Sequence, residues 1–541
     1  MASMNPPVRR REALGTAAAI GSLPYLSRIS DVLAADPGLR FGPAEPFTFE
    51  GLIARAREMA SRPYVPPPRP APEIVQQLDY DAHGKLRFRP EYALFGDGPG
   101  VYPVTFQFVG GFFPKSVRMF ALENGQAREI LYSPDYFTVR DDSPAKQLPP
   151  DTNAFAGLWL QESRLQGDWT KREPWTTFLG ASYFRGVGEL GQVGMSARGV
   201  ALNVASGIPE EFPDFIAHWI SPALTERDPV VLHSLLDGPS ICGAYRFFIF
   251  RTSGVVMDIE KHLFLRQDIE RLGIAPLTSM FWYAEYGREG MADWRPEVHD
   301  SDGLAIWNGA GERIWRPLNN PTRVFHTSYL DQTPRGYGLL QRDRNFDHYL
   351  DGVGYDRRPS TWVEPIGDWG RGMVQLVEIP TDDEIHDNIA AYWLAEDPTK
   401  AGDALTYHYR LHWVADQPGF PAKELARVVA TRMGRGGQPG KPRPKGVFKF
   451  TIEFLGGPLA NLPFGVLPEP VIWTSRGTTS LVMMEAVPND VPGHWRLFFD
   501  LTVDGNEPVD MRVHLKQGNT LLSETWLYLF EPAILRTLWP A

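Results

Sequence analysis

The sequence predicts an all-β protein with a large N-terminal β-sandwich and a smaller immunoglobulin-like β-sandwich at the C-terminus. Runs rich in β-branched and aromatic residues recur along the chain, such as TFQFVGGFF at 105–113, and Gly, Pro, Asn and Asp separate them. Helix and strand patterns do not alternate, which argues against a doubly wound or TIM-type fold. The 541 residues are 43% hydrophobic and 22% charged, a globular composition long enough for more than one core.

Residues 1–36 have the pattern of an export signal. Arg9, Arg10 and Arg11 precede Leu14, a modest Ala- and Gly-rich apolar stretch and the small pair Ala34-Ala35. Paired arginines in this setting predict a twin-arginine signal, and the alternative is a basic amphipathic tail. No later stretch has 18 uncharged apolar residues, so we expect no membrane span.

The rest of the chain divides at a Pro- and Gly-rich segment. One helix is predicted over 47–64, because its apolar residues recur every three or four positions before three prolines. Strands then dominate residues 37–415, a linker follows at 416–425, and six or seven strands in 426–541 predict the second sandwich. Within that part, the Gly- and Pro-rich stretch 433–446 is either a surface loop or a lid near a polar site.

Charge and cysteine content exclude several classes of protein. The formal net charge of −11 argues against a nucleic-acid-binding surface, which needs a basic face. Cys242 is the one cysteine, so no intramolecular disulfide forms, and its apolar strand pattern predicts a buried thiol. No P-loop, nucleophile elbow or dinucleotide fingerprint is present, and we expect no cofactor.

The sequence HDSDG at 299–303 admits three interpretations: a metal loop, a catalytic carboxylate or a polar turn. A calcium loop starting at Asp300 would place Leu304, Ala305 and Gly311 where an oxygen ligand, a glycine and a glutamate are required. A zinc site would need further His or Cys at ligand spacing. We therefore expect no metal at this stretch, and spacing alone leaves the turn and the catalytic carboxylate open.

Carboxylates, aromatic rings and cations concentrate between residues 282 and 393, as a polyhydroxylated ligand requires. Glycoside cleavage needs a carboxylic acid on the leaving oxygen and a second carboxylate opposite. Because Asp also favours turns and caps, each of these carboxylates has a structural alternative. The candidates are Asp300, Asp302, Glu384 and Asp387, with Trp307, Trp362, Trp393, Tyr355, Arg344 and His348 as substrate-binding residues.

Long motifs in order resemble the osmoregulated periplasmic glucans biosynthesis G/D family, over residues 47–530. They include FLGASYFRGVG (178–188), VHDSDGLAIW (298–307), GYGLLQRDRNFDHY (336–349), RRPSTWVEP (357–365) and VEIPTDDEIHDNIAAYW (377–393). The twin-arginine start is more similar to the D branch.

The resemblance implies a fold, a location and a reaction. The N-terminal sandwich would be of the galactose-mutarotase type, in the periplasm, with β-1,2-glucan bound in a groove. A homodimer is compatible with it. The reaction would be inverting endo-cleavage; the alternatives are an inverting transglycosylase that cyclises the glucan and a non-catalytic glucan-binding scaffold.

The resemblance also assigns roles to residues. Asp387 would be the general acid, Asp300 the base-side carboxylate and Tyr355 part of a proton relay, with Asp302 as support and His299 orienting the loop. Inverting geometry places the two carboxyl groups about 6.5 Å or more apart. Asp383 stands where some relatives have Gly, and we expect its charge to raise the pKa of Asp387.

Overall fold

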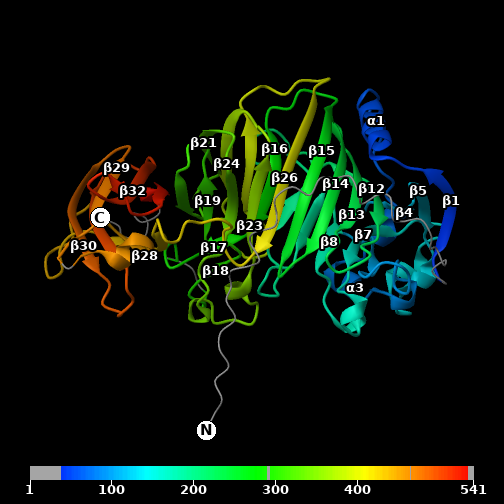
Figure 1. The fold of residues 1–541 in the computed structure, drawn as a ribbon, viewed down its shortest axis with the longest axis horizontal. Helices are drawn as coiled ribbons and strands as arrows, with labels where there is room; N and C mark the ends of the chain where they lie inside the picture. The colour runs from blue at the N-terminus through cyan, green and yellow to red at the C-terminus, as the bar shows by residue number, and fades with distance from the viewer. Residues whose placement is uncertain (1–37, 289–292, 464, 534–541) are drawn as a thin grey trace, which may run out of the picture.

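The computed structural model describes residues 38–288, 293–463 and 465–533. This part of the chain is built mainly from β-sheets that pack on one another, so the predicted all-β class is confirmed (Figure 1). The predicted export signal, residues 1–36, lies outside the described residues. Among the described helices, none is long and apolar enough to cross a membrane.

One long sheet of 16 strands extends from the N-terminal part to the C-terminal part. Its order is β1-β5-β4-β12-β13-β14-β15-β26-β23-β22-β19-β20-β34-β32-β29, with β33 beside β32. The pairs β4–β12 and β20–β34 are parallel. The strand bounds are β1 Arg40–Pro46, β4 Arg118–Glu123, β5 Gln126–Leu131, β12 Asp214–Ser221, β13 Val230–Asp237, β14 Ile241–Arg251, β15 Val255–Leu265, β19 Gly303–Trp307, β20 Arg313–Pro317, β22 Gly336–Leu340, β23 Ser360–Ile366, β26 Ala404–Val414, β29 Glu469–Thr474, β32 Val509–Gln517, β33 Thr520–Leu521 and β34 Thr525–Phe530.

A second sheet of 10 strands packs against the N-terminal part of the first. Hydrogen bonds join the layers: Nε1 of Trp413 on β26 donates to the Met195 carbonyl at 3.1 Å, and the Tyr337 hydroxyl of β22 donates to the Ile274 carbonyl at 3.0 Å. The order is β21-β24-β25-β16-β10-β9-β8-β7-β3, with β11 beside β16. The bounds are β3 Val104–Phe108, β7 Phe155–Leu160, β8 Thr176–Leu179, β9 Tyr183–Gly186, β10 Ser196–Arg198, β11 Ala201–Leu202, β16 Leu272–Ser279, β21 Phe325–Gln332, β24 Arg371–Glu378 and β25 Ile389–Ala395.

The two-residue alternation of a half-buried strand is clear in β15, and it carries a lysine into the core. Val255, Met257 and Ile259 are buried, and the same face continues with Lys261. The Lys261 ammonium donates to the Gly199 carbonyl at 2.9 Å and lies 5.7 and 5.4 Å from the ring centroids of Tyr245 and Tyr409. Burial lowers the pKa of Lys261 to about 7.

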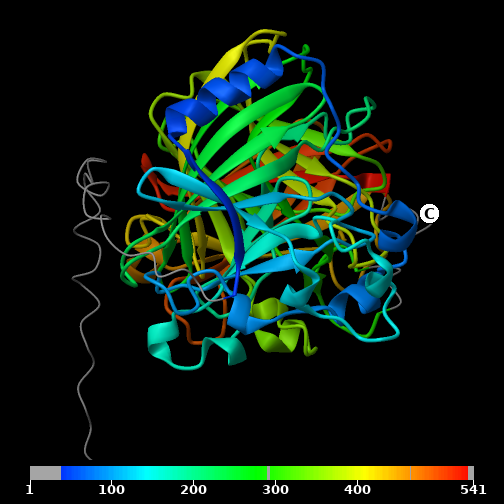
Figure 2. The ribbon, with the colours of Figure 1, turned by 90° about the vertical axis from the view of Figure 1, so that its right-hand side faces the viewer.

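The helix predicted over 47–64 is α1, Phe49–Ala60, which lies across the outer face of the long sheet (Figure 2). The Thr48 hydroxyl caps it by accepting from the Gly51 amide at 2.9 Å. Its apolar face packs with Trp219 and Phe264 of the sheet. The other helical segments are short: α2 Pro72–Val75, α3 Tyr80–Gly84 and the 3₁₀ turns η2 Pro90–Tyr92, η3 Pro134–Tyr136, η4 Pro144–Gln147, η5 Arg164–Gln166, η6 Trp169–Lys171, η7 Phe346–His348, η8 Tyr355–Arg357 and η9 Gly457–Asn461.

The C-terminal strands form a sandwich that is joined to the long sheet. A four-stranded sheet of order β27-β28-β31-β30 contributes Phe450, whose ring centroid lies 5.1 Å from that of Phe530 on β34. Strand β34 in turn pairs with β20, with Ile314 opposite Thr525. The sequence did not predict this continuity. The bounds are β27 Arg427–Arg435, β28 Val447–Leu455, β30 Thr478–Ala486 and β31 His494–Thr502, and two small sheets pair β2 Arg87–Phe88 with β6 Phe137–Thr138 and β17 Phe281–Tyr283 with β18 Val298–His299.

Two smaller predictions concern Cys242 and the stretch 433–446. Cys242 is buried, its Sγ lies 3.2 Å from a carboxylate oxygen of Asp237, and burial raises its pKa, so the predicted buried thiol is confirmed. Strand β27 continues to Arg435, so the irregular segment is shorter than predicted. Residues 438–445 are all exposed.

Candidate active site

Asp300 and Asp387, far apart in sequence, are both attached to the connection between β16 and β17. The Asp300 amide donates to the Met280 carbonyl at 2.8 Å, directly after β18. Asn388, next to Asp387, accepts from the Phe281 amide at 2.8 Å and donates to the Phe281 carbonyl at 2.9 Å. Because Met280 and Phe281 are neighbours, these bonds bring the two carboxylates to one end of the second sheet.

The Asp387 loop is also tied to the end of β24. Besides Phe281, the Asn388 side chain donates to the Ile379 carbonyl at 2.9 Å, and the Ile379 amide donates back to the Asn388 carbonyl at 2.9 Å. The loop therefore closes at a fixed point while Asp387 itself remains exposed. Asp387 is therefore held next to an anchored residue, Asn388.

Asp300 is a buried carboxylate surrounded by charges of both signs. Nε of Arg358 lies 3.0 Å from its Oδ1, an ion pair without the alignment of a hydrogen bond. Burial raises the pKa of Asp300 to about 6; Arg358, His299 and Arg185 oppose this shift, and the charge of Asp387 adds to it. The carboxyl group of Asp300 therefore titrates close to neutral pH.

The pKa of Asp387 is raised as well, as the sequence predicted, but for a different reason. Desolvation by the surrounding protein atoms is the largest cause, and Arg198, the Thr278 hydroxyl, Arg185 and Arg358 act in the opposite direction. Asp383 is not among the principal causes, so the expected effect of its charge stays a prediction. Asp387 as a whole residue is exposed to solvent, whereas its carboxyl group is surrounded by enough protein atoms to be partly desolvated.

Tyr355, Glu384 and Arg295 form a hydrogen-bonded chain beside Asp300. The Tyr355 hydroxyl donates to Oε2 of Glu384 at 2.5 Å, and Arg295 donates to the same oxygen at 2.7 Å. Tyr355 is buried, and burial together with the Glu384 hydrogen bond raises its pKa. The charge of Asp300 acts on Tyr355 in the same direction, so the two groups are near each other. The chain therefore joins Tyr355, Glu384 and Arg295 in the neighbourhood of Asp300.

Asp302 and Arg344 lie close by and have structural partners. Oδ2 of Asp302 accepts from the amides of Arg342 and Asp343 at 3.0 and 2.9 Å, which holds the chain after β22. The Arg344 guanidinium donates to the Asp356 and Ala415 carbonyls at 3.0 and 2.8 Å. Asp302 therefore braces the chain after β22, and Arg344 braces the segment that carries Tyr355 and Arg358.

Two of the three tryptophans proposed as substrate-binding residues, Trp362 and Trp393, require correction, and Trp307 stays a prediction. Trp362 and Trp393 are 2% and 0% exposed in the sandwich core, so neither offers a ring face to a ligand. The Trp307 ring is covered by the Arg313 guanidinium, 3.5 Å from its centroid, and Arg335 lies 5.3 Å away. Trp362 and Trp393 belong to the buried core, and the partly buried Trp307 packs against that core. Aromatic enrichment in the sequence does not distinguish a tryptophan that packs in the core from one that stacks on a ligand.

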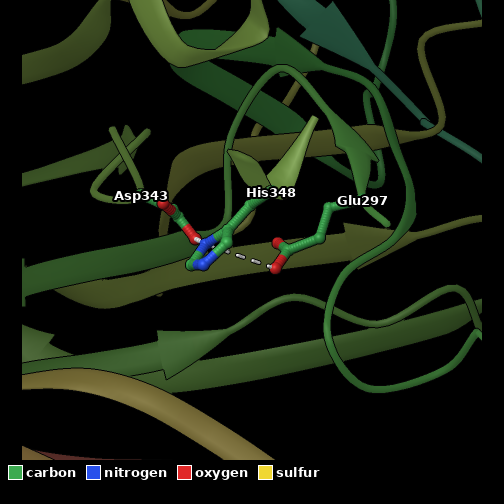
Figure 3. A group of neighbouring side chains, drawn as sticks. All are labelled: Glu297, Asp343 and His348. Carbon is green, nitrogen blue, oxygen red and sulfur yellow. Dashed lines mark hydrogen bonds and ion pairs between the residues drawn. The ribbon is translucent and has the colours of Figure 1, made fainter. Parts of the chain in front are cut away.

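His348 belongs to a His–carboxylate group with Glu297 and Asp343 (Figure 3). Its Nδ1 bonds to a carboxylate oxygen of Asp343 and lies 3.8 Å from Oε1 of Glu297. The three ligand atoms lie within 4.8 Å of one another, a spacing that would suit a metal ion. However, the His348 nitrogen is engaged with Asp343 and Glu297 is engaged with His299 at 2.9 Å, so we assign no metal to it.

The structure adds residues that the sequence did not single out. Arg185 acts on the pKa of both carboxylates and Arg198 on that of Asp387, and Arg198 is itself paired with Glu210 at 2.6 Å. The sequence motifs already contained two of the arginines near the carboxylates, because Arg185 lies in FLGASYFRGVG and Arg358 in RRPSTWVEP. Their charges, however, meet the carboxylates only in the folded chain.

Comparison with known proteins decides the family. The family model described as "Periplasmic glucan biosynthesis protein, MdoG" matches residues 47–530. The chain belongs to this periplasmic glucan biosynthesis family. It is 56% identical over 531 residues to glucans biosynthesis protein D 2 of Ralstonia nicotianae, which covers 97% of this chain and 98% of that one. Glucans biosynthesis protein D of Stenotrophomonas maltophilia is 43% identical over 526 residues, 96% and 97% of the two chains.

Membership in the MdoG family confirms the resemblance seen in the motifs. The matched region contains every residue of the candidate site, from Arg185 to Asp387. It ends at Phe530, the last residue of β34, so the C-terminal sandwich belongs to the family fold too.

Proposed function

We propose that this protein cleaves the β-1,2-linked backbone of periplasmic glucan by an inverting acid–base mechanism. Asp387 would protonate the glycosidic oxygen, and Asp300 would be the base-side carboxylate. The observation that carries the proposal is the attachment of both carboxylates to the Met280–Phe281 connection, together with their electrostatic coupling. Two coupled carboxyl groups with raised pKa values are what an acid and a base acting near neutral pH require.

The surroundings support a division of labour between the two groups. Asp387 is open to solvent, where a glucan chain has access. Asp300 is 9% exposed and adjoins the Tyr355–Glu384 chain, through which it can receive the proton of a water or sugar hydroxyl bound some distance away. Arg185 and Arg358 place positive charge near both carboxylates, and their guanidinium groups can donate to sugar hydroxyls.

The decisive experiment incubates the full chain with linear β-1,2-glucan and measures the products by mass. Shorter linear chains support the proposal. Products lighter than the linear chain by one water would replace hydrolysis with cyclising transfer by the same residues. Unchanged chains together with measurable binding would overturn the enzyme proposal in favour of a scaffold.

Variants assign the roles. Asp387→Asn and Asp300→Asn should each lower turnover by about 10²–10⁴-fold, the usual contribution of a positioned acid or base. Asp397→Asn, an exposed carboxylate beyond the far end of β25, is the matched control and should retain activity. Full turnover by Asp387→Asn would refute the assignment.

Export, domain division and assembly complete the proposal. We propose that residues 1–36 direct twin-arginine export, so Arg10→Lys with Arg11→Lys, the pair two residues before Leu14, should retain the protein in the cytoplasmic fraction. We also propose that residues 37–415 and 426–541 form two domains joined by a linker at 416–425. Limited proteolysis tests this division, because cleavage is expected within the linker. A homodimer, which the family resemblance allows, is tested by the mass of the particle in solution.

A further inference from the structure

His299 is a fully buried histidine with both ring nitrogens engaged. Its Nδ1 lies 2.9 Å from Oε1 of Gln341, and its Nε2 lies 2.9 Å from Oε2 of Glu297. The ring also stacks on Phe281 at 5.6 Å and meets the edge of Tyr349 at 5.3 Å. Because imidazole has one donor and one acceptor when neutral and two donors when charged, these partners determine its protonation.

Gln341 fixes the first nitrogen. Its Nε2 lies 3.1 Å from the His299 carbonyl and 3.0 Å from the Tyr355 carbonyl, and both of these groups can only accept. The amide group must therefore point its nitrogen at the carbonyls and its oxygen at His299. A reversed amide would bring its oxygen against two carbonyl oxygens inside the core. Since an amide oxygen only accepts, Nδ1 of His299 carries a proton.

Glu297 fixes the second nitrogen. Glu297 is 4% exposed, and its Oε2 faces Nε2 of His299. Because a carboxylate oxygen only accepts, Nε2 of His299 is the donor of this hydrogen bond and carries a proton as well. Asp302 and Asp343 add negative potential at the ring. Burial opposes the charge, but the Glu297 hydrogen bond and these carboxylates raise the pKa of His299.

This cation stands beside the candidate base. His299 precedes Asp300 directly, and its charge is among the groups that lower the pKa of Asp300 against the effect of burial. The charged and titratable groups that face Asp300 are Arg358, Arg185, Asp387 and Tyr355. Those that face His299 are Glu297, Asp302 and Asp343, and Asp343 is itself paired with His348. If His299 were neutral, less positive charge would oppose the effect of burial, and the pKa of Asp300 would be higher.

We propose that His299 is a permanently charged imidazolium, locked by Gln341 and Glu297, and a positioning residue that keeps the candidate base Asp300 ionised. It contacts no substrate in this assignment and acts only through Asp300. The role of Asp300 rests on the proposed function, whereas the charge of His299 rests on its hydrogen bonds alone. The two can therefore fail separately.

The first experiment measures the charge directly. In protein labelled with ¹⁵N at histidine, the ring nitrogens of His299 should both resonate as protonated from about pH 5 to about pH 8, where an unperturbed histidine loses its proton. The 12 histidines are assigned with single variants, and His408→Gln, on β26, is a spectral control. A His299 nitrogen that is deprotonated at about pH 8 overturns the proposal, whatever the enzyme does.

The second experiment tests the effect on Asp300. His299→Gln should shift the acidic limb of the pH–rate profile upward by roughly half a unit to one unit, because a nearby positive charge is lost. Glu297→Gln should shift the acidic limb in the same direction, because without the Glu297 carboxylate His299 loses the proton on its second nitrogen. A lower rate with an unchanged acidic limb in both variants would show a purely structural histidine and refute the positioning role.

Discussion

The Tyr355 hydroxyl donates a hydrogen bond to Glu384 at 2.5 Å, and Arg295 holds the same carboxylate oxygen at 2.7 Å. Tyr355 lies on η8 and Glu384 on the loop between β24 and β25, so this bond joins the segment that carries Arg358 to the one that carries Asp387. It therefore links the surroundings of the candidate base to those of the candidate acid.

Removal of this hydroxyl tests the relay. Tyr355→Phe should lower kcat by about tenfold or more with little change in KM, because the ring remains and only proton transfer is lost. Steady-state kinetics on linear β-1,2-glucan measure this. Tyr407→Phe, on β26 outside this network, is the matched control. Equal kcat values for the two variants would remove Tyr355 from the mechanism.

The charge state of Asp300 should govern activity on the acidic side. Its pKa is raised to about 6 by burial, so the carboxylate is present above that pH and lost below it. A base must be ionised, and turnover should therefore fall as pH drops through about 6. A pH–rate profile measures this, and because Asp300 and Asp387 interact, its apparent values belong to the pair. Constant turnover down to about pH 4, the ordinary carboxyl range, would exclude Asp300 as the base.

The buried Lys261 should lower the free energy of unfolding, and more so at low pH than at high pH. Its folded pKa of about 7 lies below the unfolded value, so between these values the unfolded chain binds more protons and stability rises with pH. Lys261→Met should raise Tm at about pH 6 by the equivalent of a few kcal/mol and by less at about pH 9. Thermal unfolding measures both. The exposed Lys400→Met is the control, and a gain that is equal at the two pH values would contradict the explanation.

The buried pair of Arg316 and Glu378 should behave as a unit. The two side chains are 1% exposed and meet at 2.8 Å. Either Arg316→Met or Glu378→Leu should destabilise by about 3–5 kcal/mol, because an unpaired charge is left in the core. The double variant should recover much of the loss. Thermal unfolding of the three proteins tests this, and additive losses would show that the pair is not coupled.

The group of Glu297, Asp343 and His348 should not need a metal ion. Its ligand atoms are close enough for one, but His348 bonds to Asp343 and Glu297 to His299. Dialysis against a chelator should leave turnover on linear β-1,2-glucan unchanged, and elemental analysis should find less than one metal ion per chain. Activity lost on dialysis and restored by a divalent cation would assign the group to a metal.

Much of the architecture followed from local patterns. Recurrent β-branched and aromatic runs predicted the sheets, and the spacing of apolar residues before three prolines predicted α1 to within a few residues at each end. The ordered motifs predicted the family that the comparison then showed. The continuity of β20 with β34 was not predictable, because pairing between strands so distant in the chain leaves no local periodicity.

By itself, the sequence determined the β class, the family and the two carboxylates Asp300 and Asp387 as candidates. Only the tertiary structure decided their environment, because burial and charge depend on neighbours from other strands. It placed Arg185 and Arg358 near both groups, turned Trp362 and Trp393 into the core, and set Gln341 against His299. A pattern of residue types specifies which side chains can do acid–base chemistry, and packing specifies which of them carry a proton.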